Sequence, residues 1–299
     1  MDWQKGRQSD NVVEDDGRSG GGGGGGMQFG GFHIGIGGII LIVIVSLLFG
    51  KNPLDILSML NGGADTGTQT VQQAPPQAGT PSTASDPQHQ FVRSVLGSTE
   101  DVWGAYFQAG GQRYEQPKML LFQGQTRSGC GAASESMGPF YCPADRRVYL
   151  DLGFFHEMDT RFHAQGDFAR AYVIAHEVGH HVQNLIGVMS KVEEARRGGQ
   201  PMEGASGLSV RQELQADCFA GVWANRSQAQ LHWINQGDVD AALNAASSVG
   251  DDTLQKQARG YAVPDSFTHG SSAQRQRWFK AGFASGDIKS CDTFAAQSL

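Results

Sequence analysis

The sequence predicts an α+β fold that is predominantly helical, contains a small β-sheet and is preceded by one transmembrane helix. Apolar residues recur at helical spacing through most of residues 86–299, whereas only residues 118–123 and 147–151 have the β-branched and aromatic content of short strands. An uncharged apolar run at residues 32–49 is long enough to span a bilayer. Residues 86–299 are sufficient for one domain with its own core.

The N-terminal part of the chain predicts a tail followed by a membrane span. Residues 1–31 are polar and acidic with a glycine run at residues 20–26, so we expect a disordered, glycine-rich tail. Residues 32–50 are expected to form a transmembrane signal anchor, because the eighteen residues of the apolar run would measure about 27 Å as a helix. The alternatives are a buried element of the folded domain and a cleaved signal peptide, although the run starts late for the latter.

The distribution of basic residues predicts the orientation of this span. Lys5, Arg7 and Arg18 precede it and Lys51 follows it, a small excess of the kind found on the cytoplasmic side. We therefore expect residues 1–31 to be cytoplasmic. Residues 51–85 are rich in Pro, Gln, Thr and Ala, a composition typical of a linker that holds a domain away from the membrane.

Helices in the domain are predicted by apolar spacing together with end signals. Asp167 is a candidate N-cap of a helix that ends near Gly187, and Ser271 or Ser272 is a candidate N-cap of a helix that ends at Gly286. The predicted helices cover residues 87–97, 99–109, 167–187, 209–225, 238–248, 252–259 and 272–285.

The helix predicted at residues 167–187 contains the pattern His176-Glu177-Val178-Gly179-His180. Two histidines four residues apart lie on one face of a helix, where both can bind one metal ion, most often Zn²⁺. Glu177 lies beside that face, where its carboxylate can act as general base toward a metal-activated water. The pattern predicts hydrolysis, with peptide bonds as the first candidate substrate. The alternative is a core helix whose histidines are only hydrogen-bonded.

A third protein ligand is needed for a catalytic zinc site, and Glu213 is the candidate. Ser209 and Gln212 form a capping-box pattern that predicts the start of a helix. Glu213 and Asp217 are four apart on it, so they share a face on which Asp217 can accept the N–H of a ligating histidine. Asp217 as the third ligand is the alternative, and a solvated acidic face is another.

These motifs resemble those of the gluzincin metallopeptidases, and the wider pattern is similar to the bacterial putative neutral zinc metallopeptidase family. The resemblance covers most of residues 86–295 and the layout of the N-terminal anchor. It rests on Tyr141-Cys-Pro-Ala-Asp145, Val148-Tyr-Leu-Asp-Leu152, the His176 motif, Glu213-Leu-Gln-Ala-Asp217 and Ser266-Phe-Thr-His-Gly-Ser-Ser272.

The resemblance implies a zincin-like metallopeptidase domain at residues 86–299, with one Zn²⁺ per chain and a peptide or protein as substrate. The expected location is the inner (plasma) membrane of a bacterium, with a single pass and a periplasmic catalytic domain. A catalytically idle zinc-fold module that binds an envelope partner is one alternative, and a zinc amidase acting on a non-peptide amide is another. Glu177 separates the first alternative from a hydrolase, since a binding module needs no base beside the metal.

Amide hydrolysis also needs a hydrogen-bond donor for the developing oxyanion, and His269 and Tyr261 are the candidates. The alternative is a plain turn in which His269 only caps a helix. We expect His181 to point away from the metal-binding face. The other histidines have no ligand spacing and are expected to be structural: His89, His156, His163 and His232.

The strand predicted at residues 147–151 precedes the metal-binding helix, as the edge strand that pairs with extended peptide does in gluzincins. A purely structural strand is the alternative.

All four cysteines follow the apolar run, which predicts two disulfides in an oxidising compartment. Pairs Cys130–Cys142 and Cys218–Cys291 are expected among three possible connectivities, and a cysteine zinc site is disfavoured by the spacing. The net charge of −7 excludes nucleic acid as an expected partner, since no basic patch is evident.

Overall fold

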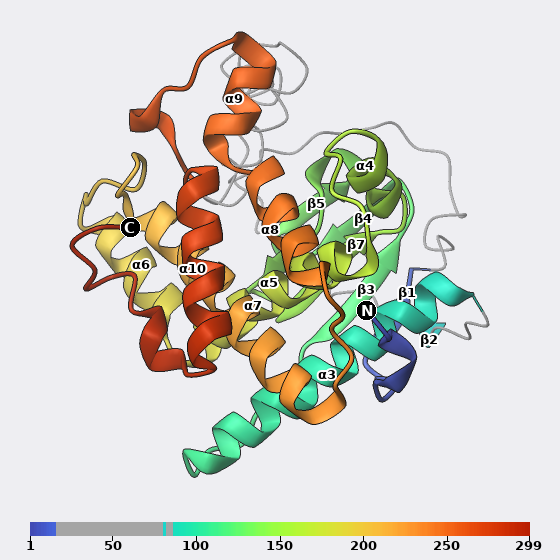
Figure 1. The fold of residues 1–299 in the computed structure, drawn as a ribbon. Helices are drawn as coiled ribbons and strands as arrows, with labels where there is room; N and C mark the ends of the chain where they lie inside the picture. Colours follow the sequence, from blue (N-terminus) through green and yellow to red (C-terminus); the bar gives the residue numbers. More distant parts are fainter. Residues whose placement is uncertain (16–79, 82–85) are drawn as a thin grey trace, which may run out of the picture.

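The computed structural model describes residues 1–15, 80–81 and 86–299, and a five-stranded mixed sheet lies on one side of a group of helices (Figure 1). The strand order is β2-β1-β3-β7-β6. The three central strands are parallel, and the two outer ones are antiparallel to their neighbours. The strands are β1 (Val12–Glu14), β2 (Thr80–Pro81), β3 (Lys118–Phe122), β6 (Phe140–Cys142) and β7 (Arg147–Asp151).

Both faces of the sheet are covered, which explains the nearly continuous apolar run of β3. Met119 and Leu121 point into the core shared with the helices, whereas Leu120 and Phe122 belong to a second cluster on the opposite face. This second cluster also contains Ala133 of the hairpin formed by β4 (Gln125–Ser128) and β5 (Gly131–Ser134).

The helices form the larger part of the domain, and α5, α7 and α10 pack against one another at its centre (Figure 1). Glycine permits the close approach of α10 to α7: a Cβ on Gly282 would lie 2.0 Å from Cys218 O, and one on Gly221 would lie 2.1 Å from Phe279 O. The helices are α3 (Pro87–Ala109), α4 (Phe154–Thr160), α5 (Asp167–Leu185), α6 (Val188–Arg197), α7 (Leu208–Leu231), α8 (Asp238–Ser248), α9 (Asp251–Arg259) and α10 (Ser272–Ser285).

The predominantly helical α+β class is therefore confirmed, with corrections in detail. The two helices expected at residues 87–97 and 99–109 form the single helix α3. Helices α5 and α7 begin after Gly166 and Gly207, so Asp167 and Ser209 lie inside the first turns and do not act as N-caps. The predicted cap of α10 is correct: Ser271 accepts a hydrogen bond from the Gln274 backbone N–H in a capping box.

The N-terminal segment corrects the expectation of a disordered tail over residues 1–31. Residues 1–15 contain a short 3₁₀ helix, Trp3–Lys5, and strand β1, which pairs with β3 inside the sheet. A three-residue strand has no visible periodicity, so only tertiary packing reveals it. The predicted span at residues 32–50 lies outside the described residues, as does the linker at residues 51–85 apart from β2. Among the described residues, no helix has both the length and the apolarity that a membrane crossing requires.

Both expected disulfides are present. Cys130–Cys142 ties the β4–β5 hairpin to β6, and Cys218–Cys291 ties α7 to the C-terminal segment. All four cysteines are therefore paired.

Candidate metal centre

Helices α5 and α7 touch at Gly179, which lies between the two histidines of the His176 motif. A Cβ on Gly179 would lie 3.0 Å from Ala216 O and 3.2 Å from its Cα. The glycine costs an isolated helix up to about 1 kcal/mol relative to alanine. Here it permits the backbone contact that brings Glu213 of α7 next to His176 and His180 of α5.

Three possible metal ligands converge at this contact. One ligand atom from each of His176, His180 and Glu213 lies within 4.8 Å of the others. His176 Nε2 is 3.2 Å from Glu213 Oε2, and His180 Nε2 is 3.5 Å from Glu213 Oε1. Two imidazoles and one carboxylate form the donor set of many catalytic zinc sites. Among the residues that the structure describes, this cluster is the one group whose spacing suits a metal ion.

The orientation of each imidazole also fits a metal. His176 Nδ1 is 2.8 Å from Asp217 Oδ1, so it donates its proton there. His180 Nδ1 is 2.9 Å from Gln183 Oε1; the Gln183 amide nitrogen donates to the Gln212 carbonyl, so the amide oxygen must face His180. Both Nδ1 atoms are thus donors, so Nε2 is the atom of each imidazole that faces Glu213 and is available to a metal ion once it carries no proton.

Asp217 therefore holds the position expected of an orienting carboxylate and lies on the Nδ1 side of His176. Its carboxylate is fully buried and also accepts hydrogen bonds from Tyr172 Oη at 2.5 Å and from Arg275. Arg275 binds it through two nitrogens, Nε to Oδ2 at 2.8 Å and Nη2 to Oδ1 at 2.9 Å. Burial opposes ionisation of Asp217, but Arg275 and His176 lower its pKa to about 2.

Sequence reasoning missed both Tyr172 and Arg275. Tyr172 is one turn before His176, where an aromatic residue fits the apolar face expected of a buried helix. Arg275 is 58 residues from Asp217 along the chain and lies on α10. The available signal was that a buried carboxylate needs a buried cation, but the sequence does not say which one.

A second hydrogen-bond chain supports His180. Gln183 Nε2 donates to Gln215 Oε1 at 3.0 Å, and Gln215 Nε2 donates to the Cys291 carbonyl at 3.0 Å. These contacts connect the imidazole of His180 to the disulfide-linked C-terminal segment. Gln183 therefore orients His180 as Asp217 orients His176, but it is an amide and lies on the same helix as the histidine.

Glu177 lies beside the cluster in a nearly buried position, 8 % exposed. Burial raises the pKa of its carboxyl group even though His176 and His180 act in the opposite direction. A raised pKa brings a carboxylate closer to the operating pH of a general base. The role of Glu177 as general base stays a prediction.

The loop before α10 carries His269 toward the cluster. Gly270 has φ +95°, and a Cβ there would lie 3.2 Å from Leu214 Cδ2 on α7. Asp251, at the start of α9, shapes this loop: its Oδ2 accepts the backbone N–H groups of Thr268, His269 and Gly270 at 2.7, 2.7 and 3.0 Å. Its Oδ1 lies 3.4 Å from His269 Nδ1.

The pKa of His269 also indicates that this side chain lies close to the metal cluster. Burial lowers the pKa of His269, but Asp251 and then Glu213 outweigh burial and raise it. Glu213 is thus close enough to act on the imidazole of His269. Asp251 was not among the residues singled out from the sequence, because nothing local connects it to a loop 17 residues later.

Tyr261 occupies a different kind of position from the one predicted. The side chain is 60 % exposed, and its ring centroid lies 5.2 Å from Arg259 Cζ. The structure shows no contact of Tyr261 with the metal ligands, so its role as an oxyanion donor stays a prediction.

The remaining histidines agree with their expected structural roles. His181 points away from the cluster: its Nε2 donates to Glu115 O at 2.6 Å, and Tyr141 Oη lies 3.1 Å from its Nδ1. Burial lowers the pKa of His181. Four other histidines do not belong to the metal cluster formed by His176, His180 and Glu213: His89, His156, His163 and His232.

The structure also changes the identity of the edge strand. β7, residues 147–151, lies between β3 and β6, so it cannot offer a free edge to a peptide. The outermost strand on this side is β6, which runs antiparallel to β7. Tyr141 of β6 reaches α5, where Asn184 Nδ2 donates to its hydroxyl at 2.9 Å. The sequence could not reveal this order, because β6 is three residues long and has no periodic pattern.

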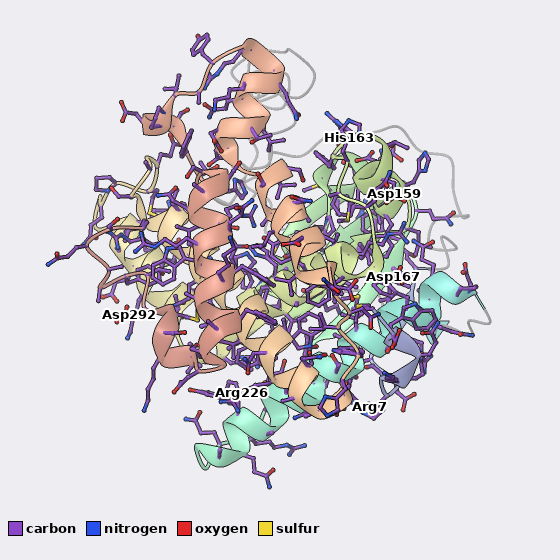
Figure 2. The ribbon with its side chains drawn as sticks, viewed as in Figure 1. Arg7, Asp159, His163, Asp167, Arg226 and Asp292 are labelled. Carbon is purple, nitrogen blue, oxygen red and sulfur yellow. A yellow bond between two sulfur atoms is a disulfide. The ribbon has the colours of Figure 1, made fainter. Side chains whose placement is uncertain are left out.

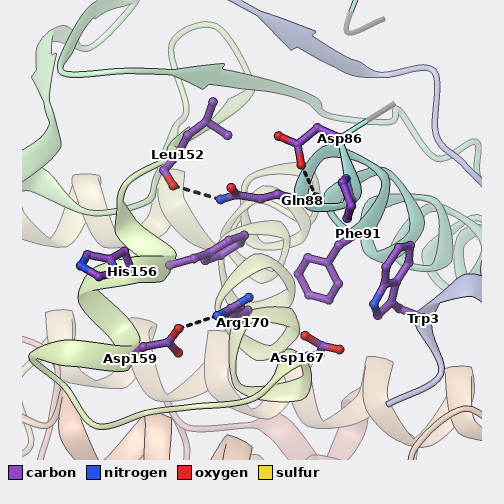
Figure 3. Close-up of a pocket in the computed structure, with 11 residues that line it drawn as sticks. Trp3, Asp86, Gln88, Phe91, Leu152, His156, Asp159, Asp167 and Arg170 are labelled. Carbon is purple, nitrogen blue, oxygen red and sulfur yellow. Dashed lines mark hydrogen bonds and ion pairs between the residues drawn. The ribbon is translucent and has the colours of Figure 1, made fainter. Parts of the chain in front are cut away.

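A cavity of about 520 Å³ lies apart from this cluster, where the N-terminal segment meets the starts of α3 and α5 (Figure 3). Trp3, Phe91 and Phe155 form its aromatic wall, and Asp159 and Arg170 form an ion pair at 2.6 Å beside it. None of its lining residues is a member of the metal cluster.

Zinc binding is expected to release at least one proton per metal ion at pH 7. In metal-stripped protein, burial opposes the charge on His176, but Asp217 and Glu213 outweigh burial and raise its pKa to about 10. Ligation requires a neutral imidazole, so zinc must displace this proton, and affinity must fall as the pH falls. Calorimetric titration of zinc in two buffers of different ionisation enthalpy measures the number of protons. Identical enthalpies in both buffers would contradict this expectation.

The chain is similar to a known protein family and to proteins from several bacteria. The sequence profile of a family described as "Putative neutral zinc metallopeptidase" matches residues 1–294. The uncharacterized protein YpfJ of Escherichia coli is 47 % identical over 296 residues, which cover 98 % of this chain and 99 % of YpfJ. The uncharacterized protein Rv2575 of Mycobacterium tuberculosis is 43 % identical over 221 residues, which cover 71 % of this chain and 73 % of Rv2575. No solved structure matches significantly.

Proposed function

Since the chain belongs to the putative neutral zinc metallopeptidase family, we propose that it is a zinc-dependent hydrolase that cleaves peptide bonds. The observation that carries this proposal is the convergence of His176, His180 and Glu213 within 4.8 Å, with Glu177 beside them. A site that only bound zinc for stability would use four protein ligands. Here three ligands and an adjacent buried carboxylate suit hydrolysis instead.

The residues have distinct roles in this proposal. His176, His180 and Glu213 hold one zinc ion, which when bound supplies Lewis-acid chemistry that acidifies water and polarises a carbonyl group. Glu177 accepts the proton of the attacking water and returns it to the leaving amine. Asp217 and Gln183 keep the two imidazoles in the tautomer that ligation needs.

His269 donates a hydrogen bond to the oxyanion that develops on the scissile carbonyl. Asp251 positions it by accepting three backbone N–H groups of its loop and by lying next to its Nδ1. Although burial opposes it, Asp251 and Glu213 raise the pKa of His269, which favours the form protonated on both ring nitrogens. With Nδ1–H held toward Asp251, Nε2–H of that form is the donor available to a substrate. Tyr261 has no part in this proposal, because its side chain is 60 % exposed and its ring packs on Arg259.

A peptide substrate suits the outer edge of β6 better than β7. β6 is the last strand of the sheet beside α5, and an extended peptide can pair with such an edge through its backbone. The Cys130–Cys142 disulfide fixes the end of β6, so the edge is held in position.

We place the catalytic domain outside the cytoplasm. The support for this is that all four cysteines are paired in two disulfides, which persist in oxidising compartments and are rare in reducing ones.

The function is tested with full-length protein purified with its disulfides intact. Zinc content is measured by mass spectrometry, and the protein is incubated with a diverse peptide library whose cleavage is read by the same method. We expect one zinc ion per chain and cleavage that stops on chelation and returns with added zinc. Zinc without any peptide cleavage would contradict a peptidase and favour an amidase or an idle module, and no zinc at all would overturn the metal site.

Replacing His269 with alanine is expected to lower kcat about 100-fold with little change in zinc content, because removing one oxyanion donor typically costs this much. Asp251→Asn is expected to lower kcat less, because the imidazole stays but is less well positioned. Tyr261→Phe is the comparison variant, with an expected change below about twofold, since that ring is mostly exposed to solvent. An unchanged kcat in His269→Ala would remove His269 from the mechanism.

A further inference from the structure

Residues 1–15, here called the strap, are held to the domain from the first residue. The α-amino group of Met1 lies 3.0 Å from Asp238 Oδ2 on α8. The Asp2 backbone N–H donates to the Trp233 carbonyl at 2.7 Å. Trp3 packs edge-to-face on Phe91 of α3, with ring centroids 6.0 Å apart (Figure 3). The first three residues are thus attached to the folded domain by an ion pair, a backbone hydrogen bond and an aromatic contact.

The middle of the strap is built around Glu100, a carboxylate on α3 with only 1 % of its side chain exposed. Arg7 Nη2 donates to Glu100 Oε2 at 2.6 Å, and the Arg7 side chain lies beside α3 (Figure 2). Ser9 Oγ and Asn11 Nδ2 donate to Glu100 Oε1 at 2.6 and 2.7 Å. If the strap were absent, Glu100 would lose three donors, which is costly for a buried carboxylate.

The backbone of the strap lies directly against α3 and the sheet. A Cβ on Gly97 would lie 2.1 Å from Arg7 O, so this helix glycine is matched to the strap backbone. Further along, β1 pairs with β3 in parallel register, with Val12 opposite Met119, and Val12 is 1 % exposed within the core.

The chain leaves the domain and returns to it at the same place. Glu14 is the last residue of β1, and His89 lies in the first turn of α3, 75 positions later. Glu14 Oε1 is 3.1 Å from His89 Nδ1. Both ends of the intervening chain are therefore attached to one side of one folded body.

We propose that the strap and the domain of residues 86–299 lie on the same side of any membrane that the protein contacts. The chain between Glu14 and His89 then crosses that membrane an even number of times, including zero. The apolar run at residues 32–49 has the length for one crossing, because its eighteen residues would measure about 27 Å as a helix. A single crossing would put the strap and the domain on opposite sides, so strap docking and a single-pass anchor exclude each other.

This proposal replaces the predicted topology of a cytoplasmic tail and a periplasmic domain. A single-pass form would lack β1, would expose the core around Val12 and would leave Glu100 without its three donors. The proposal does not depend on peptidase activity, so its test uses no activity readout.

Membrane sidedness is tested in the full chain with single exposed cysteines. Asp10→Cys lies on the strap, where its side chain is 98 % exposed, and Lys280→Cys lies on the exposed face of α10. All native cysteines are in disulfides, so a membrane-impermeant maleimide reports the new thiol. The chain is produced in a Gram-negative host with a permeabilised outer membrane, and labelling is compared before and after lysis of the inner membrane. We expect the two sites to behave alike; one site reactive and the other protected until lysis would overturn the proposal.

Docking of the strap in cells is tested by cross-linking. Asp2 Oδ1 lies 3.2 Å from Asn235 Nδ2, so a short membrane-permeant bismaleimide can join Asp2→Cys to Asn235→Cys in one chain. We expect most of the double variant to carry the intramolecular link, and each single variant serves as the control for thiol reactivity. Reactive thiols that fail to cross-link would show that the strap is undocked and would also overturn the proposal.

Discussion

Exchange of Glu177 for glutamine is expected to lower kcat/KM for peptide cleavage by about 10²–10⁴-fold while one zinc ion per chain remains bound. The amide keeps the size of the side chain but cannot accept a proton from water. His176, His180 and Glu213 are untouched, so the metal ligands keep their arrangement. Activity and zinc content are measured on the same preparation, which separates a lost base from a lost metal.

Glu194→Gln is the matched control for this experiment, because Glu194 is an exposed glutamate on the neighbouring helix α6. It is expected to leave kcat/KM within about twofold. Loss of zinc in Glu177→Gln would identify Glu177 as a ligand, and full activity with bound zinc would remove it from the chemistry.

Replacement of Asp217 by alanine is expected to destabilise the metal-free protein by about 3–5 kcal/mol. The change leaves the guanidinium of Arg275, which is 5 % exposed, without its carboxylate, and it also removes the acceptor of Tyr172 and His176. Urea unfolding in the presence of a chelator measures this effect apart from zinc affinity. Asp10→Ala, which removes a 98 % exposed partner of Arg93, is the control, with an expected loss below about 1 kcal/mol.

The double variant Asp217→Ala/Arg275→Leu distinguishes an unpaired charge from a general packing defect. If the cost comes from the stranded guanidinium, removing it should recover part of the lost stability. A double variant less stable than Asp217→Ala would contradict that explanation.

The stabilising effect of Asp217 also has a defined pH range. The pKa of Asp217 is lowered from 3.8 to about 2 in the fold, since Arg275 and His176 outweigh burial. The stabilisation is therefore fully present above the unfolded-state value and is lost as the pH falls through the folded-state value. Between about pH 4 and pH 2, the stability difference between wild type and Asp217→Ala should shrink.

The strongest sequence predictions concerned residues whose relation is local. His176 and His180 share a helix face because they are four residues apart, and Glu213 and Asp217 do so for the same reason. The cap of α10 at Ser271 and Gln274 is similarly local. Such patterns survive folding because the geometry of one helix turn does not depend on the rest of the chain.

Predictions were weaker where an element is too short to have a period. β1 and β6 are three residues each. β7 was expected at an edge of the sheet, but it pairs with β3 along one edge and with β6 along the other. The polar and acidic composition of the first 31 residues suggested disorder. The structure shows that polar side chains such as Arg7 and Ser9 are used there to satisfy the buried Glu100.

By itself, the sequence determined the family, the mostly helical class and the candidate metal ligands. These depend on patterns of residues that are close together in the chain, such as two histidines four positions apart. Only the tertiary structure decided which partners complete the site: Arg275 for Asp217, Asp251 for the His269 loop, and the strap for Glu100. These pairs join residues 17 to 93 positions apart. Their contact depends on how helices and strands pack, and no local pattern encodes that choice.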